Sequence, residues 1–72
     1  MQEIEIMTDV IHLDQFLKWA NVVSSGGEAK VLIQSGQVRV NGEIETRRSL
    51  KLKAGTVVEL STGETFVLRT EK

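Results

Sequence analysis

Four cations lie close together in one segment of the chain: Arg47, Arg48, Lys51 and Lys53. An arginine guanidinium is planar and donates hydrogen bonds from a fixed fork, so it can bind two oxygens of one phosphate. A lysine ammonium adds a hydrated point charge that attracts the same anions. The chemistry that this segment predicts is therefore the non-covalent binding of phosphate groups.

The charge of the chain is distributed unevenly, although its net charge is only −1 over 72 residues. Residues 1–15 carry a net charge of −4, residues 16–55 carry +4 and residues 56–72 carry −1. A positive middle segment is typical of a protein that binds a polyanion. A solvated surface that keeps the protein soluble is the alternative, and charge counting alone leaves it open.

The composition argues against several classes of protein. With no Cys and one His, the chain offers no disulfide and no thiolate site, so we expect no metal and no cofactor. No carboxylate cluster is paired with a base, and so short a chain has little room for a small-molecule substrate, so we expect no enzyme. No apolar run approaches the roughly 20 residues of a membrane span, and the acidic start MQEIEIM is unlike a signal peptide. We therefore expect a cytoplasmic protein that does not enter a membrane.

Two short helices are predicted in the first half of the chain. Apolar residues recur at helical spacing in one segment: Leu13, Phe16, Leu17 and Ala20. Ser25 followed by Glu28 is a capping-box pattern, which predicts that a second helix begins near Gly26. Gly36 is the left-handed residue that commonly follows the last turn of a helix.

Short strands are predicted around these helices. The segments with strand character are 3–6, 38–40, 56–60 and 65–68, and residues 48–53 alternate basic with apolar side chains. Asn41-Gly42 predicts a tight hairpin, because both central residues of a type I′ turn need positive φ. The sequence thus predicts one α+β domain over residues 1–72, with two short helices packed on a small, mainly antiparallel sheet.

The second helix supplies further candidates for phosphate binding. Its exposed face presents Gly27, Lys30 and Gln34. The N-terminus of a helix has free N–H groups and a partial positive charge, so Ser25 and Gly27 are interpreted as an anion site. An ordinary capped turn that uses glycine for flexibility is the alternative.

Other polar residues extend the predicted surface. Arg39 lies between two apolar strand residues and must point outward, so we expect it to join Arg47 and Arg48 beside the start of the second helix. Lys18 would border that surface, and Gln37 could donate to phosphates. For the two arginines, ion pairing with a nearby glutamate is the alternative.

Trp19 lies at the margin of the apolar face of the first helix. We interpret it as covering the edge of a small core, and stacking on an unpaired base is the alternative. The chain has no Tyr and two Phe, so no aromatic platform for reading single strands is predicted. The pattern favours recognition of shape and backbone.

Two segments match a known family: FLKWA at 16–20, and SSGGEAKVLIQSGQVRVNGEIETRRSLKLKAGTVVEL at 24–60. They resemble the S-four domain, the RNA-binding domain named after the fourth protein of the small ribosomal subunit. The resemblance covers residues 11–60, and GQVRVNG with TRRSLKLKAGTVV is its most specific part. The whole chain looks like the stand-alone bacterial YaaA-type members. Many family members have an Arg between the two helices, where this sequence has Ser24-Ser25-Gly26-Gly27.

The resemblance implies the alpha-L RNA-binding motif and recognition of structured, ribosomal RNA. We therefore expect a non-catalytic protein that grips the phosphate backbone of such RNA. The candidate contact residues are Lys18, Ser25, Gly27, Lys30, Gln34, Gln37, Arg39, Arg47, Arg48, Lys51 and Lys53. A protein-interaction adaptor, whose basic face docks an acidic protein partner, is the alternative.

Overall fold

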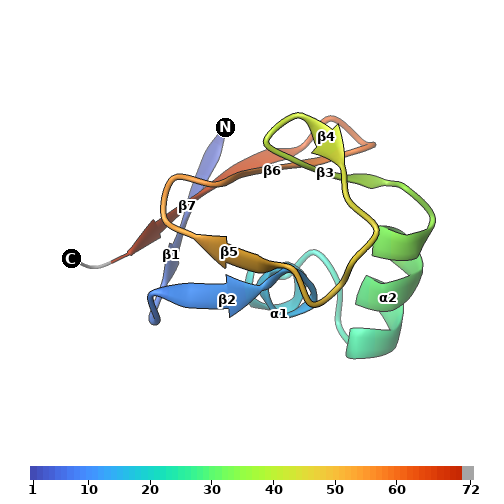
Figure 1. Cartoon of the computed structure of the whole chain (residues 1–72), viewed down its shortest axis with the longest axis horizontal. Coiled ribbons are helices and arrows are strands. Elements are labelled where there is room, and N and C mark those ends of the chain that lie inside the picture. The colour runs from blue at the N-terminus through green and yellow to red at the C-terminus, as the bar shows by residue number, and fades with distance from the viewer. Residues whose placement is uncertain (71–72) are drawn as a thin grey trace.

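The computed structural model describes residues 1–70, so residues 71 and 72 of the predicted domain lie outside the described part. The elements follow in the order β1 (Gln2–Ile6), β2 (Val10–His12), α1 (Leu13–Trp19), α2 (Gly26–Gln34), β3 (Val38–Val40), β4 (Glu43–Ile44), β5 (Lys51–Lys53), β6 (Val57–Leu60) and β7 (Thr65–Thr70) (Figure 1). The predicted class, two short helices on a mainly antiparallel sheet, is confirmed. No helix in the described part is long and apolar enough to span a membrane.

The main sheet has five strands in the order β1-β7-β6-β3-β4. The first pair, β1 with β7, is parallel, and the other three pairs are antiparallel. A second, two-stranded antiparallel sheet pairs β2 with β5. The sequence did not predict this second sheet, and only Lys51–Lys53 of the alternating segment 48–53 form a strand.

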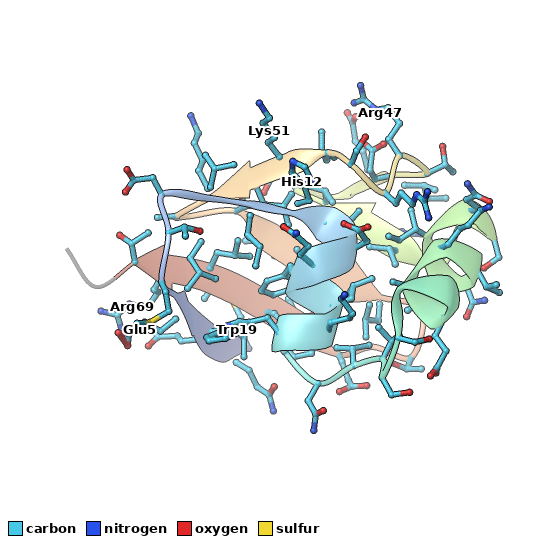
Figure 2. All side chains as sticks on the ribbon, turned by 90° about the horizontal axis from the view of Figure 1, so that it is seen from below. Glu5, His12, Trp19, Arg47, Lys51 and Arg69 are labelled. Atoms are coloured by element: carbon cyan, nitrogen blue, oxygen red, sulfur yellow. The ribbon has the colours of Figure 1, made fainter. Side chains whose placement is uncertain are left out.

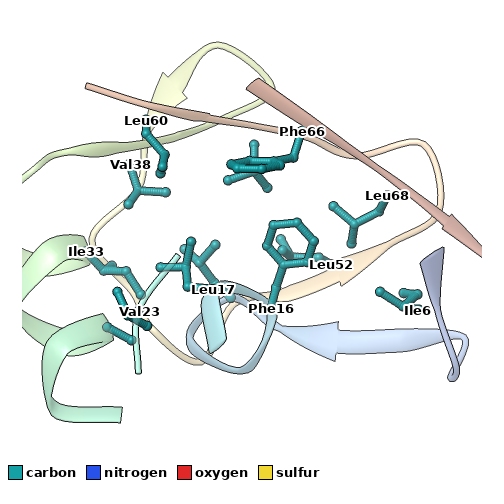
Figure 3. Close-up of a cluster of buried hydrophobic side chains, with 13 residues drawn as sticks. Ile6, Phe16, Leu17, Val23, Ile33, Val38, Leu52, Leu60, Phe66 and Leu68 are labelled. Carbon is teal, nitrogen blue, oxygen red and sulfur yellow. The ribbon is translucent and has the colours of Figure 1, made fainter. Parts of the chain in front are cut away.

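The core lies between the five-stranded sheet and a second layer that contains the helices and the β2–β5 pair (Figures 1 and 3). Its buried apolar residues are Ile6, Leu13, Phe16, Leu17, Val23, Ala29, Ile33, Val38, Leu52, Val58, Leu60, Phe66 and Leu68. The rings of Phe16 and Phe66 meet edge to face at 6.1 Å, an arrangement that aromatic quadrupoles favour. This contact joins α1 directly to β7.

The start of α2 is capped as the sequence predicts, with one difference. The Ser25 hydroxyl oxygen accepts the N–H of Glu28 at 3.2 Å. The carboxylate of Glu28 accepts a hydrogen bond from the hydroxyl of Ser24, where a full capping box would use the backbone N–H of Ser25. Both serines therefore help to fix the beginning of the helix.

The end of α2 has the predicted left-handed glycine, with Gly36 at φ +79°. The N–H of Gly36 donates to the carbonyl of Ile33 at 3.1 Å, and the N–H of Gln37 donates to that of Leu32 at 3.3 Å. These two bonds form a Schellman motif. The motif turns the chain back toward the sheet, where β3 begins.

The predicted hairpin at Asn41-Gly42 connects β3 to β4, with φ values of 51° and 89°. The two positive values are those that a type I′ turn requires. Asn41 also donates its N–H to the carbonyl of Val57 at 2.8 Å, and its Oδ1 accepts the N–H of Val57 at 3.0 Å. The turn is thereby fastened to β6 through both the backbone and the side chain of Asn41.

Candidate nucleic-acid interface

The segment that joins β4 to β5, residues 45–50, is called the arginine loop here because it carries Arg47 and Arg48. The N–H of Leu13 donates to the carbonyl of Leu50 at 2.9 Å, and the N–H of Asp14 donates to that of Arg48 at 3.0 Å. The first N–H groups of a helix have no partner within it, so the arginine loop satisfies two of them in α1. The position of the loop is therefore fixed by the start of α1.

Arg47 forms the ion pair that the sequence left open as an alternative. Its Nε lies 3.1 Å from Oε2 of Glu45, and its backbone N–H donates to the same oxygen at 2.9 Å. These hydrogen bonds lower the pKa of Glu45 and raise the pKa of Arg47. The Arg47 side chain nevertheless stays 72% exposed, so a phosphate can reach it.

Arg48 is exposed, and no carboxylate within residues 1–70 forms an ion pair with it. Its backbone is held by the bond to Asp14 while its side chain extends into solvent. Arg48 therefore presents an unpaired guanidinium from a fixed backbone position.

The two-stranded sheet adds two lysines to the same side of the molecule. In its register Lys51 lies opposite His12 and Lys53 lies opposite Val10, while Leu52 between them is buried in the core. Residues directly opposite in an antiparallel pair share a face, so both lysines are on the outer face. Figure 2 shows Lys51 and Arg47 projecting from the same side, with His12 beside Lys51.

A separation of two residues corresponds to a rotation of about 200° around a helix axis. Lys30 and Gln34 therefore lie on one flank of α2, and Glu28 and Leu32 lie on the opposite flank. The flank with Glu28 and Leu32 lines a groove that reaches Ser61 in the β6–β7 turn. Lys30 and Gln34 are exposed on the opposite flank, and the arginine loop passes beside this helix (Figure 1). They can therefore extend the surface of the arginine loop.

Lys18 is exposed in the last turn of α1, with no carboxylate paired to it in the described part of the chain. The arginine loop binds the first turn of the same helix, and five residues of helix rise by about 8 Å. Lys18 therefore lies about 8 Å further along the axis of α1 than the residues that are bonded to the arginine loop.

Arg39 is not on this surface, contrary to the sequence-based interpretation. It lies opposite Glu59 and Ile44 in the five-stranded sheet, between core-facing Val38 and half-buried Val40. The helices cover the face that carries Val38, so Arg39 belongs to the outer face. Alternation along β3 correctly predicted that Arg39 points away from the core. It could not predict on which side of the sheet the arginine loop lies.

Ser25 and Gly27 line the groove on the far flank of α2, together with the acidic residues Glu28 and Glu64. Gln37 lines the same groove, and its side-chain oxygen accepts the Ser61 hydroxyl at 3.3 Å. Within residues 1–70, no ion pair joins Arg47 or Arg48 to the start of α2, so their predicted meeting with that helix end stays a prediction. The loop is bonded to the start of α1, and two carboxylates border the groove at α2.

His12 belongs to the outer face of the two-stranded sheet, and the sequence-based set of contacts did not include it. It lies in β2 and immediately precedes α1, with its N–H donating to Oε1 of Gln15 at 3.4 Å. Its place beside Lys51 follows only from the β2–β5 register, which no local pattern indicated. Within residues 1–70, no three His, Asp or Glu side chains are grouped so that they could hold a metal ion.

The fold and the exposed cations define a small α+β domain with the alpha-L arrangement of elements. A family model described as the S4 domain matches residues 4–68, and the chain belongs to this family. The resemblance to the S-four RNA-binding domain is thereby confirmed.

Two relatives and one solved structure show how far the similarity extends. The chain is 49% identical over 57 residues to the probable ribosome maturation protein RlbA of Bacillus subtilis, covering 79% of this chain and 80% of that protein. It is 39% identical over 51 residues to the putative RNA-binding protein YbcJ of Escherichia coli, covering 71% and 73%. The solution structure of E. coli YbcJ, described as having an alfaL motif involved in RNA binding, aligns with a TM-score of 0.70 at 32% identity and covers 94% and 86% of the two chains.

Proposed function

We propose that this protein is a non-catalytic RNA-binding module that grips the phosphate backbone of structured, ribosomal RNA. The observation that carries the proposal is a set of exposed cations, which we call the basic strip. It consists of Lys18, Lys30, Arg47, Arg48, Lys51 and Lys53. Apart from Arg47, none of these side chains forms an ion pair within residues 1–70. Unpaired cations at exposed positions are free to replace the counterions of a nucleic acid.

Within the basic strip, the arginine loop is the proposed centre of the contact. The bonds from Leu13 and Asp14 hold its backbone in place, so less freedom is lost when RNA binds. Glu45 takes the Nε and Nη2 edge of the Arg47 guanidinium, at 3.1 and 3.4 Å. The other edge of that guanidinium remains available for a phosphate, while Arg48 offers its whole fork.

The names of the relatives support ribosomal RNA as the target. RlbA is described as a "probable ribosome maturation protein" and YbcJ as a "putative RNA-binding protein", and both align with most of this chain. Binding to ribosomal RNA would place the protein in the cytoplasm. Of the sequence-based candidates, Gln34 is an uncharged neighbour of Lys30 on α2. We assign no central role in this contact to Arg39, Ser25, Gly27 and Gln37, which also lie outside the basic strip.

A salt series tests this proposal. The ligands are a folded ribosomal RNA fragment and a DNA duplex of equal charge, titrated with the purified protein. If about four phosphates are neutralised, log K should fall against log salt with a slope near −3 to −4, and the RNA should bind more tightly than the duplex. Absence of binding to either ligand at low salt would contradict the proposal and favour an adaptor that docks an acidic protein surface.

A further inference from the structure

An apolar pocket lies at the end of α1, next to Lys18 of the basic strip. It has a volume of about 520 Å³, and Ile6, Met7, Val10, Gln15, Lys18 and Trp19 are among its lining residues. Three of these are unusually exposed for large apolar side chains: Met7 at 68%, Val10 at 43% and Trp19 at 53%. Such a group on so small a domain indicates a binding site, because isolated apolar residues on a surface are ordinary but contiguous ones are not.

Trp19 is held in a fixed orientation although more than half of it is exposed. Its indole Nε1 donates to the backbone carbonyl of Glu5 at 2.7 Å, which fastens the ring to β1 (Figure 2). The bond satisfies the polar atom of the indole and leaves its apolar surface for a ligand. A rigid, already hydrogen-bonded ring loses little entropy when another flat group stacks on it.

The polar groups around this pocket fit a nucleotide. Lys18 carries the only full charge among the residues that line it in the described part of the chain. Val10 on its rim lies opposite Lys53 in the β2–β5 register, so a second cation of the basic strip is adjacent. Gln15 uses its Oε1 to accept the N–H of His12, which leaves its amide N–H groups free to donate to a base edge.

We propose that this pocket takes one unpaired nucleobase of the bound RNA, stacked on Trp19, with its phosphate toward Lys18 and Lys53. Glu5, whose backbone carbonyl accepts the Trp19 indole N–H, carries a negative charge that disfavours a phosphate on the β1 side. The inference rests on the proposed function, because the pocket continues the basic strip. It adds a preference that the strip alone lacks: RNA with a bulged or looped base beside a helix is bound more tightly than a continuous helix.

The test compares two RNA hairpins that differ by one bulged nucleotide. Trp19 is the only tryptophan of the chain, so its fluorescence reports on the pocket without any mutation. The bulged hairpin should quench Trp19 and bind about 5- to 150-fold more tightly than the fully paired hairpin, the range expected for stacking of one base. Trp19→Leu should remove that difference and leave binding of the paired hairpin unchanged. Val31→Ala, which truncates an exposed apolar residue on α2, is the matched control and should retain the preference.

The outcomes separate this inference from the proposed function. Equal binding of both hairpins without quenching would overturn the nucleobase pocket while the basic strip still stands. Failure of both hairpins to bind would remove the proposed function and the pocket together. A Trp19 signal that changes with protein concentration in the absence of RNA would also overturn the inference, because a second copy of the chain would then occupy the pocket.

Discussion

The backbone N–H of Asp14 donates to the carbonyl of Arg48 at 3.0 Å. This bond, with the neighbouring one from Leu13 to Leu50, makes the first turn of α1 and the arginine loop a single unit. Leu13 is itself fully buried, so the core fixes the helix and the helix fixes the loop. The position of the proposed RNA contact thus depends on ordinary hydrophobic packing a few residues away.

Replacement of Ser25 by Ala should separate a structural role from an RNA contact. The hydroxyl of Ser25 accepts the N–H of Glu28, so its loss should lower the free energy of unfolding by about 1 kcal/mol. Urea unfolding measures that change. The affinity for RNA, measured where both proteins are folded, should stay the same, because Ser25 lies in the groove bordered by Glu28 and Glu64. Weaker RNA binding without a loss of stability would show that Ser25 contacts the RNA.

Replacement of Asn41 by Asp should destabilise the fold less than replacement by Ala. Asn41→Ala removes the oxygen that accepts the N–H of Val57 and places an alanine at φ 51°. Together these changes should lower the free energy of unfolding by about 1–2 kcal/mol. Asn41→Asp keeps both the acceptor and the tolerance of positive φ, so its midpoint in urea should be close to the original. Equal losses in the two variants would mean that the turn does not depend on this side-chain bond.

The ion pair between Glu45 and Arg47 should be lost at low pH, when Glu45 is protonated. Hydrogen bonds from Arg47 lower the pKa of Glu45 below its ordinary value of 4.5, so the folded state favours the carboxylate. The stabilisation is therefore present above pH 4.5 and is lost as the pH falls through the lowered pKa. An NMR titration of the Glu45 carboxyl should show a midpoint below 4.5, together with loss of the Arg47 Nε–H resonance. In the variant Arg47→Gln, the midpoint should return toward the ordinary value; an unchanged midpoint would assign the shift to another group.

Features that depend on neighbouring residues were predicted well from the sequence. Ser25 with Glu28 marks the start of α2, Gly36 marks its end, and Asn41-Gly42 marks the hairpin. Each of these signals depends on backbone geometry that few residue types can adopt or on a hydrogen bond within four positions. The structure has all three.

Features that depend on distant pairing were not predicted. The strand Val10–His12 is three residues long and pairs with Lys51–Lys53, about 40 residues later in the chain. So short a strand has no recognisable alternation, and no local pattern in the sequence indicates its partner. The same limit explains why Arg39 was placed on the wrong surface. Alternation shows which residues of a strand share a face, but it does not show which face the helices cover.

Removal of two arginines from the arginine loop, compared with removal of two from the outer face of the main sheet, tests the central claim most directly. The variant Arg47→Gln/Arg48→Gln removes two positive charges from the arginine loop. The matched control Arg39→Gln/Arg69→Gln removes two from the outer face of the five-stranded sheet, where Arg69 pairs with Glu3 at 2.7 Å. Both variants have the same net charge, so long-range attraction to RNA is equal in the two.

The measurement is the slope of log K against log salt for one folded ribosomal RNA fragment with the original protein and both variants. We predict that loss of Arg47 and Arg48 flattens the slope by about two, whereas loss of Arg39 and Arg69 leaves it unchanged. An unchanged slope in the first variant, or equal flattening in both, would contradict the assignment of the RNA contact to the arginine loop.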